Sequence, residues 1–186
     1  FDWDEDRKQH LIQSGYRPTE DRMYHHRRRA VDNTLPEQVI PQHYVIRNVE
    51  NSEVDVYMWI ETTNKTFGHS HAPEMHRNFQ RFSPSHDYEL HIIAEALDGT
   101  VAAFAGLTVD QRNRYATFEP VGTHPDHRRK GLARAVMVEG IRRLQARGTV
   151  DTVYVANWGT SDAGKFYASI GMEHYATFRA WKKVFR

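Results

Sequence analysis

The sequence predicts a mixed α/β fold in which helices flank a largely antiparallel sheet of six to seven strands. Two observations lead to this prediction. Strand-like runs over residues 88–97, 101–109 and 114–123 are joined by short turns, so they form an antiparallel meander. A long helical pattern over 130–147 then leads to a short apolar strand, an order that requires one parallel pair with a right-handed crossover.

Each remaining element has its own pattern. Residues 4–14 predict a short helix that ends at a glycine, and residues 16–29 predict an extended polar stretch. Residues 30–43 contain two prolines among polar side chains and are expected to be a linker. Further helices are expected over 52–64, 73–81 and 162–170, and further strands over 44–49, 152–156, 172–178 and 181–185.

Composition restricts the class of protein. With 39% apolar and 26% charged residues, the chain has the balance of a soluble globular domain. It contains no cysteine, which excludes disulfides, cysteine-ligated metals and thiol nucleophiles and fits a cytoplasmic protein. The 25 basic and 24 acidic residues give a net charge of +1, so nucleic acid is not an expected partner. No apolar run is long enough to cross a membrane, so no membrane partner is expected.

The most informative segment joins the strand over 114–123 to the helix over 130–147. Gly131 permits a tight turn, and the backbone N–H groups around 129–133 then point into one concavity at the positive end of the helix. Such a concavity binds phosphate. The cationic side chains close to it are Arg128, Arg129, Lys130 and Arg134. The spacing fits neither a P-loop nor a Rossmann fingerprint, and an ordinary basic loop remains the alternative.

The run Arg-x-x-Gly-x-Ala at 128–133 resembles the acetyl-CoA pyrophosphate loop of the GNAT superfamily of N-acetyltransferases. A second run, residues 166–172, is similar to the superfamily's Leu-Tyr-x-x-x-Gly-Phe segment, with Met172 in place of the phenylalanine. The order of elements over 42–186 matches as well. The resemblance implies the acyl-CoA N-acyltransferase fold, acetyl-CoA as co-substrate, and transfer of an acetyl group to a primary amine of a small molecule or peptide.

The resemblance also implies which residues bind acetyl-CoA. The end of the strand would pair with the pantetheine arm through its backbone, and the loop would hold the pyrophosphate. The implied cofactor-binding residues are Val121, Gly122, Thr123, Arg128, Arg129, Lys130, Gly131, Leu132, Ala133, Arg134, Asn157 and Thr160. Asn157 lies about three residues earlier than the superfamily's usual asparagine and Thr160 lies nearer to that place, so the role of Asn157 stays open.

By the same resemblance, Tyr167 would protonate the departing thiolate. Glu119 is the first candidate for the general base, because a partly buried carboxylate at the strand end can have a raised pKa and accept the amine proton. His91 and Glu95 on a neighbouring strand are the alternatives. Pro120 removes a hydrogen-bond donor next to Glu119, so we expect the sheet to bulge or split there.

Other kinds of site receive less support. His69, His71 and His76 have no carboxylates in register with them, so no metal site is expected. Arg27–Arg29 form a short basic run of the kind that is usually solvated. A non-catalytic acyl-CoA-binding or regulatory domain with the same fold is the alternative function. The presence of Tyr167 and Glu119 favours the enzyme.

Residues 8–29 run helix, glycine, strand and are similar in this to residues 166–185. We therefore expect residues 1–36 to be the tail of a preceding GNAT-like domain with its linker, and residues 37–186 to carry the acetyltransferase domain. A simple N-terminal extension is the alternative, and a homodimer stays open. Because the predicted core begins at Tyr44, we expect the fold to survive removal of residues 1–36.

Overall fold

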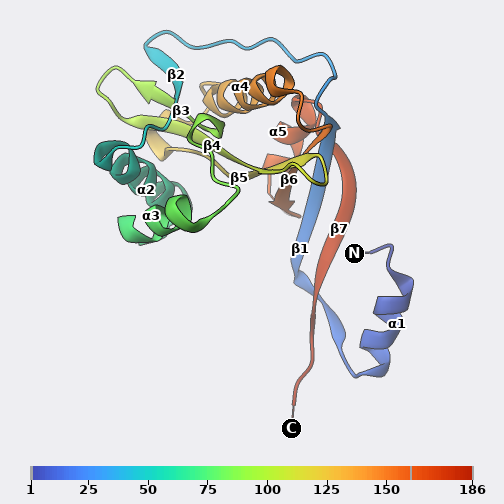
Figure 1. Ribbon diagram of the computed structural model, residues 1–186. Helices are drawn as coiled ribbons and strands as arrows, with labels where there is room; N and C mark the ends of the chain where they lie inside the picture. The colour runs from blue at the N-terminus through green and yellow to red at the C-terminus, as the bar shows by residue number, and fades with distance from the viewer. Residues whose placement is uncertain (1, 160, 186) are drawn as a thin grey trace. The chain divides into compact units, whose positions relative to one another are not determined.

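The computed structural model describes residues 2–159 and 161–185, which form two compact units (Figure 1). The 30–153 unit is built from one continuous stretch of chain. The terminal unit combines the described parts of residues 1–29 and 154–186.

The 30–153 unit contains a four-stranded antiparallel arrangement in the order β2-β3-β4-β5. Its strands are β2 (Tyr44–Asn48), β3 (His91–Ala96), β4 (Val101–Asp110) and β5 (Tyr115–Thr123). Its helices are α2 (Glu53–Phe67), α3 (Pro73–Phe82) and α4 (Leu132–Arg147), with 3-10 turns over Tyr88–Leu90 and Pro125–His127. The predicted meander is the β3-β4-β5 part of this order.

Local chemistry explains where several of these elements begin and end. Gly99, with a φ of 84°, makes the turn between β3 and β4, and the Asp98 carboxylate accepts the N–H of Thr100 at 2.9 Å. Ser52 caps α2 by accepting the N–H of Asp55 at 3.1 Å. Gly131 has a φ of 79°, so α4 begins at Leu132 and not at residue 130 as the pattern predicted.

The core of the 30–153 unit lies on both faces of its strands. Phe104 on β4 packs against Trp59 of α2, with ring centroids 5.2 Å apart. Leu107, three residues later and on the opposite face, lies against α4, where a Cβ added to Gly140 would approach Leu107 Cδ1 to 2.9 Å. Both apolar side chains are fully buried. Two helices therefore cover opposite faces of one sheet, in agreement with Figure 1.

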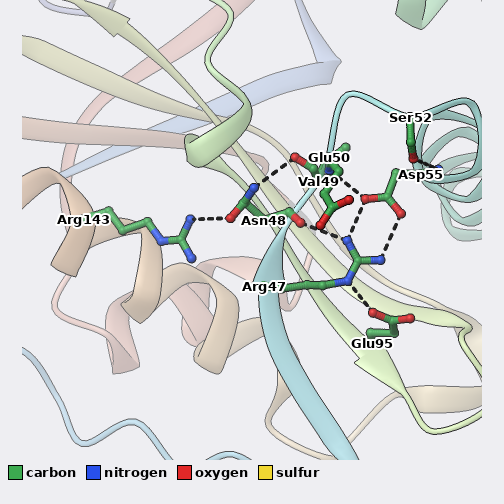
Figure 2. A network of polar contacts seen from close by, with 8 residues as sticks. All are labelled: Arg47, Asn48, Val49, Glu50, Ser52, Asp55, Glu95 and Arg143. Carbon is green, nitrogen blue, oxygen red and sulfur yellow. Dashed lines mark hydrogen bonds and ion pairs between the residues drawn. The ribbon is translucent and has the colours of Figure 1, made fainter.

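A polar network connects β2 to three neighbouring elements of this unit (Figure 2). The Arg47 guanidinium donates to Asp55 at the start of α2 and to Glu95 on β3. Next along β2, the Asn48 side chain accepts a hydrogen bond from Arg143 of α4 at 3.4 Å. The network joins the edge strand to both helical layers of the unit.

The terminal unit contains three strands in the order β6-β1-β7 and two short helices. The elements are α1 (Glu5–Gln13), β1 (Arg17–Ala30), β6 (Thr152–Trp158), α5 (Ala163–Ser169) and β7 (Glu173–Lys182). β1 pairs antiparallel with β7, from Arg17 opposite Lys182 to Arg28 opposite Glu173. None of the nine described residues of α1 is buried.

Two helix ends in the terminal unit have the same geometry. Gly15 after α1 has a φ of 81° and Gly171 after α5 has a φ of 82°. The residue after each glycine donates its N–H five residues back, from Tyr16 to the Leu11 carbonyl at 2.9 Å and from Met172 to the Tyr167 carbonyl at 3.0 Å. Both ends are Schellman motifs. The similarity that the sequence suggested between the two helix–glycine–strand segments is present in the backbone.

Most of the predicted elements are confirmed, but several predicted boundaries are wrong. The strands expected over 172–178 and 181–185 are a single strand, β7, because neither glycine nor proline interrupts the chain between them. The strand expected from residue 88 begins at His91, because the Asp87 carboxylate accepts the N–H of Glu89 and caps a 3-10 turn. The predicted mixed α/β class, with a largely antiparallel sheet and flanking helices, is confirmed.

Candidate active site

The strand β5 bulges at Glu119 and Pro120, as predicted. Along β4 the pairing changes from Ala105 opposite Val121 to Leu107 opposite Phe118, so two residues of β5 face the single residue Gly106. A Cβ added to Gly106 would lie 2.9 Å from the Glu119 carbonyl oxygen, so only glycine fits against the bulge. A bulge redirects side chains and ends regular pairing. Here it sets the direction of Glu119 relative to the rest of β5.

Glu119 combines an accessible side chain with a carboxyl that the protein surrounds on several sides. The residue is exposed, yet desolvation raises the pKa of its carboxyl above the ordinary 4.5. An accessible carboxylate with a raised pKa can both reach a ligand and accept a proton near neutral pH.

The two alternative bases have other surroundings. Glu95 is engaged by the Arg47 guanidinium. His91 is 1% exposed and stacks on Trp59, with ring centroids 5.3 Å apart. Burial, with smaller contributions from His86 and His76, lowers the pKa of His91 to about 3. A paired carboxylate and an enclosed imidazole are both poorly suited to accept a proton from a ligand, so these contacts favour Glu119.

The loop between β5 and α4 has the backbone of an anion site. Arg129 and Gly131 have φ values of 64° and 79°, and no side chain caps the N-terminus of α4. The first N–H groups of a helix have no acceptor within the helix, so here they are available to a ligand. A Cβ added to Gly131 would meet no atom within 4 Å, which shows that the space beside this turn is open. These features fit the pyrophosphate of acetyl-CoA.

Basic side chains surround this loop, and three of them donate hydrogen bonds within the protein. Arg128 donates to the Thr123 carbonyl at 3.4 Å, and Arg134 donates to the Glu37 carbonyl at 3.5 Å. Lys130 donates to the Tyr44 hydroxyl at 2.9 Å. Arg128, Arg129 and Lys130 are exposed. An arginine has five N–H donors and a lysine three, so the exposed Arg128, Arg129 and Lys130 can present charge and donors to phosphate oxygens.

Tyr44 is a residue of this site that sequence reasoning missed. Its hydroxyl lies 2.9 Å from His127 Nδ1 as well as from Lys130 Nζ, and the Lys130 ammonium lies 5.6 Å from the centroid of its ring. Tyr44 begins β2, far from the loop in sequence. An aromatic residue at a strand start is common, so the sequence carried no signal for this contact.

Within the 30–153 unit, Glu119 and residues 121–123 lie on β5, and residues 128–134 directly follow it. Tyr167 and Asn157 belong to the terminal unit. Tyr167 is 6% exposed and lies on α5. The Asn157 amide donates to the Trp158 carbonyl at 2.8 Å and accepts from Arg27 Nε at 3.3 Å. Thr160 lies outside the described residues.

The expectation that Arg27–Arg29 form a solvated run is wrong for Arg29. Arg29 is 5% exposed and donates to the Ile170 carbonyl at 2.7 Å, because the alternation along β1 turns every second side chain toward α5. Arg28 is exposed and lies over the ring of Tyr175 at 4.4 Å. A local count of charges could not distinguish the two faces of the strand.

Among residues 2–159 and 161–185, no group of three or more His, Cys, Asp or Glu side chains is arranged to hold a metal ion. In the same part of the chain, no helix has both the length and the apolar character needed to cross a bilayer.

A family model described as the acetyltransferase (GNAT) family matches residues 56–172, which is more than half of the chain. The chain belongs to the GNAT family. The match includes the bulge at Glu119, the basic loop and Tyr167. A search of curated proteins found no match.

Solved GNAT structures have the same fold at low sequence identity. A GCN5-related N-acetyltransferase from Sphaerobacter thermophilus is 20% identical, with a TM-score of 0.74 over 94% of this chain. A tandem GNAT protein from the clavulanic acid biosynthesis pathway is 17% identical, with a TM-score of 0.76 over 96% of this chain. The ribosomal-protein-S18-alanine N-acetyltransferase from Escherichia coli is 22% identical, with a TM-score of 0.57 over 69% of this chain and 76% of its own.

The two longer GNAT relatives extend well beyond the part that matches. This chain spans 55% of the Sphaerobacter protein and 58% of the tandem GNAT protein.

Proposed function

We propose that the protein is an acetyl-CoA-dependent N-acetyltransferase that transfers an acetyl group to a primary amine by direct attack in a ternary complex. The observation that carries this proposal is the uncapped N-terminus of α4, which follows the left-handed turn at Gly131 and lies among basic side chains. An N–H cradle with this charge suits a pyrophosphate and offers little to a neutral ligand. The chain's membership of the GNAT family supports the same cofactor.

The proposed chemistry assigns one proton transfer to Glu119 and one to Tyr167. Acetyl-CoA supplies the thioester, whose carbonyl carbon forms a bond to the amine nitrogen while its bond to sulfur breaks. Glu119 accepts the proton that the amine loses, directly or through water, and its raised pKa supports this role. Tyr167 donates a proton to the departing thiolate, and a backbone N–H polarises the carbonyl. No covalent enzyme intermediate is required, in keeping with a chain that lacks cysteine.

The proposed acceptor is an amine of a small molecule or a peptide, and a cytoplasmic location is the one that the lack of cysteine supports. The alternative function is a non-catalytic acyl-CoA-binding or regulatory domain. A panel of primary amines, assayed for release of free thiol from acetyl-CoA, discriminates between them. Thiol release that depends on the amine supports the enzyme, whereas coenzyme A binding without amine-dependent release supports the alternative.

We also propose that residues 1–36 are the tail of a preceding domain with its linker, joined to an acetyltransferase domain over residues 37–186. Two observations support this: the α1 and α5 ends share the same Schellman geometry, and one structural relative is a tandem GNAT protein. On this proposal the tail also pairs with β7 through β1, so the terminal unit depends on it. A simple N-terminal extension is the alternative, and a homodimer is a second candidate assembly.

The cofactor site is tested by replacing Gly131 with glutamate. Gly131→Glu places a carboxylate beside the phosphates and forces a side chain into a left-handed backbone position, so coenzyme A binding measured by calorimetry should be lost. Gly148→Glu is the matched control, because Gly148 ends the same helix with a φ of 61° and open space around it. If folded Gly131→Glu binds coenzyme A as well as Gly148→Glu does, the loop assignment is wrong.

A further inference from the structure

Two arginines of β1 hold the turn that follows α5. Arg29 Nη1 donates to the Ile170 carbonyl at 2.7 Å, and Arg27 Nη1 donates to the Met172 carbonyl at 3.3 Å. The two arginines are two residues apart on one strand, so their side chains extend from the same face. All of these residues belong to the terminal unit. The two guanidinium groups thus bind carbonyls on either side of Gly171.

The same turn holds the backbone of Tyr167. The N–H groups of Ile170 and Met172 donate to the Tyr167 carbonyl at 3.2 and 3.0 Å. Each of these two residues therefore accepts a hydrogen bond from an arginine and donates one to Tyr167. The contacts form a continuous chain from β1, through the turn, to the carbonyl of the tyrosine.

Gly171 is required at the centre of this turn for two reasons. Its φ of 82° lies in the left-handed region, which side chains disfavour. A Cβ at this position would also lie 2.9 Å from Arg29 Nη1. The turn and the guanidinium are fitted to one another, because a side chain on the turn would displace the arginine.

Arg27 also reaches the first turn of α5. Its Nε donates to the Asn157 side chain at 3.3 Å, and a Cβ added to Gly164 would lie 3.2 Å from its Nη2. Arg27 therefore lies against both the start of α5 and the turn after it. An isolated helix of seven residues is unstable in water, so external contacts must hold α5 in place. Arg27 and Arg29 supply contacts of this kind.

We infer that Arg27 and Arg29 are positioning residues that fix α5 and thereby the side chain of Tyr167 in its reactive place. This inference rests on the proposed role of Tyr167 as the acid. It makes the N-terminal strand part of the catalytic apparatus, although no residue before residue 30 was expected to contribute to the site. Neither arginine is a catalytic residue, because each acts through the turn.

The strand provides a matched control. Arg28 lies between the two positioning residues, but its side chain is on the opposite face and stacks on Tyr175. Arg28→Gln removes the same type of charge from the same strand without touching the turn. Arg29→Met removes the hydrogen bond to the Ile170 carbonyl, and Arg27→Gln removes the one from the Arg27 guanidinium to the Met172 carbonyl. Arg29→Lys keeps the positive charge and an N–H donor at position 29.

The first measurement is hydrogen exchange at the amides of Ile170 and Met172. Arg29→Met should raise their exchange rates by about tenfold or more, because the turn opens more often once its carbonyls lose their partner. Arg28→Gln should leave both rates unchanged. Unchanged exchange in Arg29→Met and in Arg27→Gln would overturn the inference. If Arg29→Met fails to fold, Arg27→Gln decides, since Arg27 is only half-buried.

The second measurement is turnover, followed by thiol release from acetyl-CoA with the best primary amine of the panel. Arg27→Gln should lower kcat by about tenfold with little change in coenzyme A affinity, and Arg29→Lys should recover part of what Arg29→Met loses. In a Tyr167→Phe background the arginine substitutions should lower kcat little further, because they act through the lost hydroxyl.

The outcomes separate this inference from the proposed function. Suppose that Tyr167→Phe lowers kcat and that the arginine substitutions lower kcat further by the same factor as they do in the natural protein. The arginines then act elsewhere, so the inference fails while the acid role of Tyr167 stands. If Tyr167→Phe leaves kcat unchanged, the acid role fails and the inference fails with it. If Tyr167→Phe and the arginine substitutions each lower kcat, and the combined variant loses little more than Tyr167→Phe alone, the acid role and the inference are both supported.

Discussion

The Arg47 guanidinium binds both carboxylate oxygens of Asp55, at 2.6 and 2.9 Å (Figure 2). This bidentate pair joins the edge strand β2 to the first turn of α2. Asp55 also accepts the N–H of Glu50 at 2.7 Å, so its carboxylate holds the loop between the two elements. The side chain of Asp55 is 8% exposed and that of Arg47 is 27% exposed. The pair is therefore shielded far more than an ordinary surface ion pair.

Breaking this pair should destabilise the fold. Asp55→Asn leaves a shielded guanidinium with a weaker partner, and we expect a loss of about 3 kcal/mol in the free energy of unfolding measured in urea. Arg114→Met is the control, because Arg114 and Asp151 form a bidentate pair whose side chains are 52% and 63% exposed. The control should lose much less stability, because solvent screens an exposed ion pair. Equal losses of unfolding free energy in the two variants would contradict the view that shielding from solvent makes the Arg47–Asp55 pair the stronger one.

The same pair predicts a dependence on pH. Burial acts to raise the pKa of Asp55, but hydrogen bonds from Arg47 and from the Glu50 N–H, with the charge of Arg47, leave the pKa below the ordinary 3.8. The folded carboxyl therefore binds its proton less readily than the unfolded one. The stability that it contributes is present above about pH 4 and is lost as the pH falls through the folded pKa. In Asp55→Asn this part of the acid dependence should disappear.

Two buried histidines, His76 and His91, and the half-buried His86 should make the 30–153 unit sensitive to acid at a higher pH. Burial, with the neighbouring His86, lowers the pKa of His76 to about 4, and His91 is lowered to about 3. Both ring nitrogens of His86 and His91 are buried without a hydrogen-bond partner in the described structure. The unfolded chain binds protons near pH 6.5 and the folded chain does not, so stability should fall between about pH 6.5 and 4. For His76 the loss is about 3 kcal/mol.

Urea titrations at several pH values test this prediction. His76→Phe and His91→Phe keep an aromatic ring in the cluster around Trp59 and remove the proton acceptor, so each should flatten the dependence between pH 6.5 and 4. The exposed His69, replaced in His69→Gln, is the control and should leave the slope unchanged. A slope that His76→Phe and His91→Phe leave intact would mean that other groups cause the acid sensitivity.

Glu119→Gln should remove a pH-dependent step from turnover. Because desolvation raises the pKa of Glu119 above 4.5, the base is active only above that raised value, and kcat of the natural protein should fall as the pH drops through it. The glutamine variant should be slower by about a hundredfold at high pH and should lack this limb. Asp110→Asn, at the far end of the adjacent strand, is the control. An unchanged pH profile in Glu119→Gln would assign the base to another group.

Tyr167→Phe should lower kcat by about a hundredfold while coenzyme A affinity measured by calorimetry changes little, as expected for loss of one proton donor. Tyr175→Phe is the matched control, since Tyr175 lies in the same unit but is 41% exposed on β7. A loss of affinity that equals the loss of turnover would instead indicate that the Tyr167 hydroxyl binds the cofactor.

Two truncations test what the N-terminal segment does. Removal of residues 1–14 takes away α1, none of whose described residues is buried, and should change stability by less than about 1 kcal/mol. Removal of residues 1–36 also takes away β1, its pairing with β7, and the buried Arg29. We therefore expect the longer truncation to unfold the terminal unit, contrary to what the start of the predicted core at Tyr44 suggested. Equal melting temperatures of the two truncated proteins would instead favour the expectation that the fold survives removal of residues 1–36.

Much of the 30–153 unit could be predicted because its information is local. The turn at Gly99 and the periodicity of α4 lie within short stretches of chain, and each agrees with the structure. The break next to Pro120 was predicted from a missing N–H donor, which is a property of one residue. The basic loop at 128–134 is also continuous in sequence, so its residues were found together.

Contacts between distant parts of the chain could not be predicted in the same way. Glu95 was a candidate base until the register of β2 and β3 brought Arg47 beside it, and His91 was a candidate until Trp59 covered it. Tyr44 reaches Lys130 across 86 positions of sequence. Each of these assignments depends on which strands are neighbours and in which register, and the pattern around a single residue does not contain that information.

The sequence by itself determined the mixed α/β class, the order of the helices and strands, and the residues of the loop before α4, because periodicity, glycine positions and a continuous motif are properties of neighbouring residues. Only the tertiary structure decided that Arg29 is buried against the Ile170 carbonyl, 141 positions away, while Arg28 beside it is exposed. The physical reason is that burial and hydrogen-bond partners arise when β1 and β7 pair, and two adjacent arginines of a strand then face opposite surroundings.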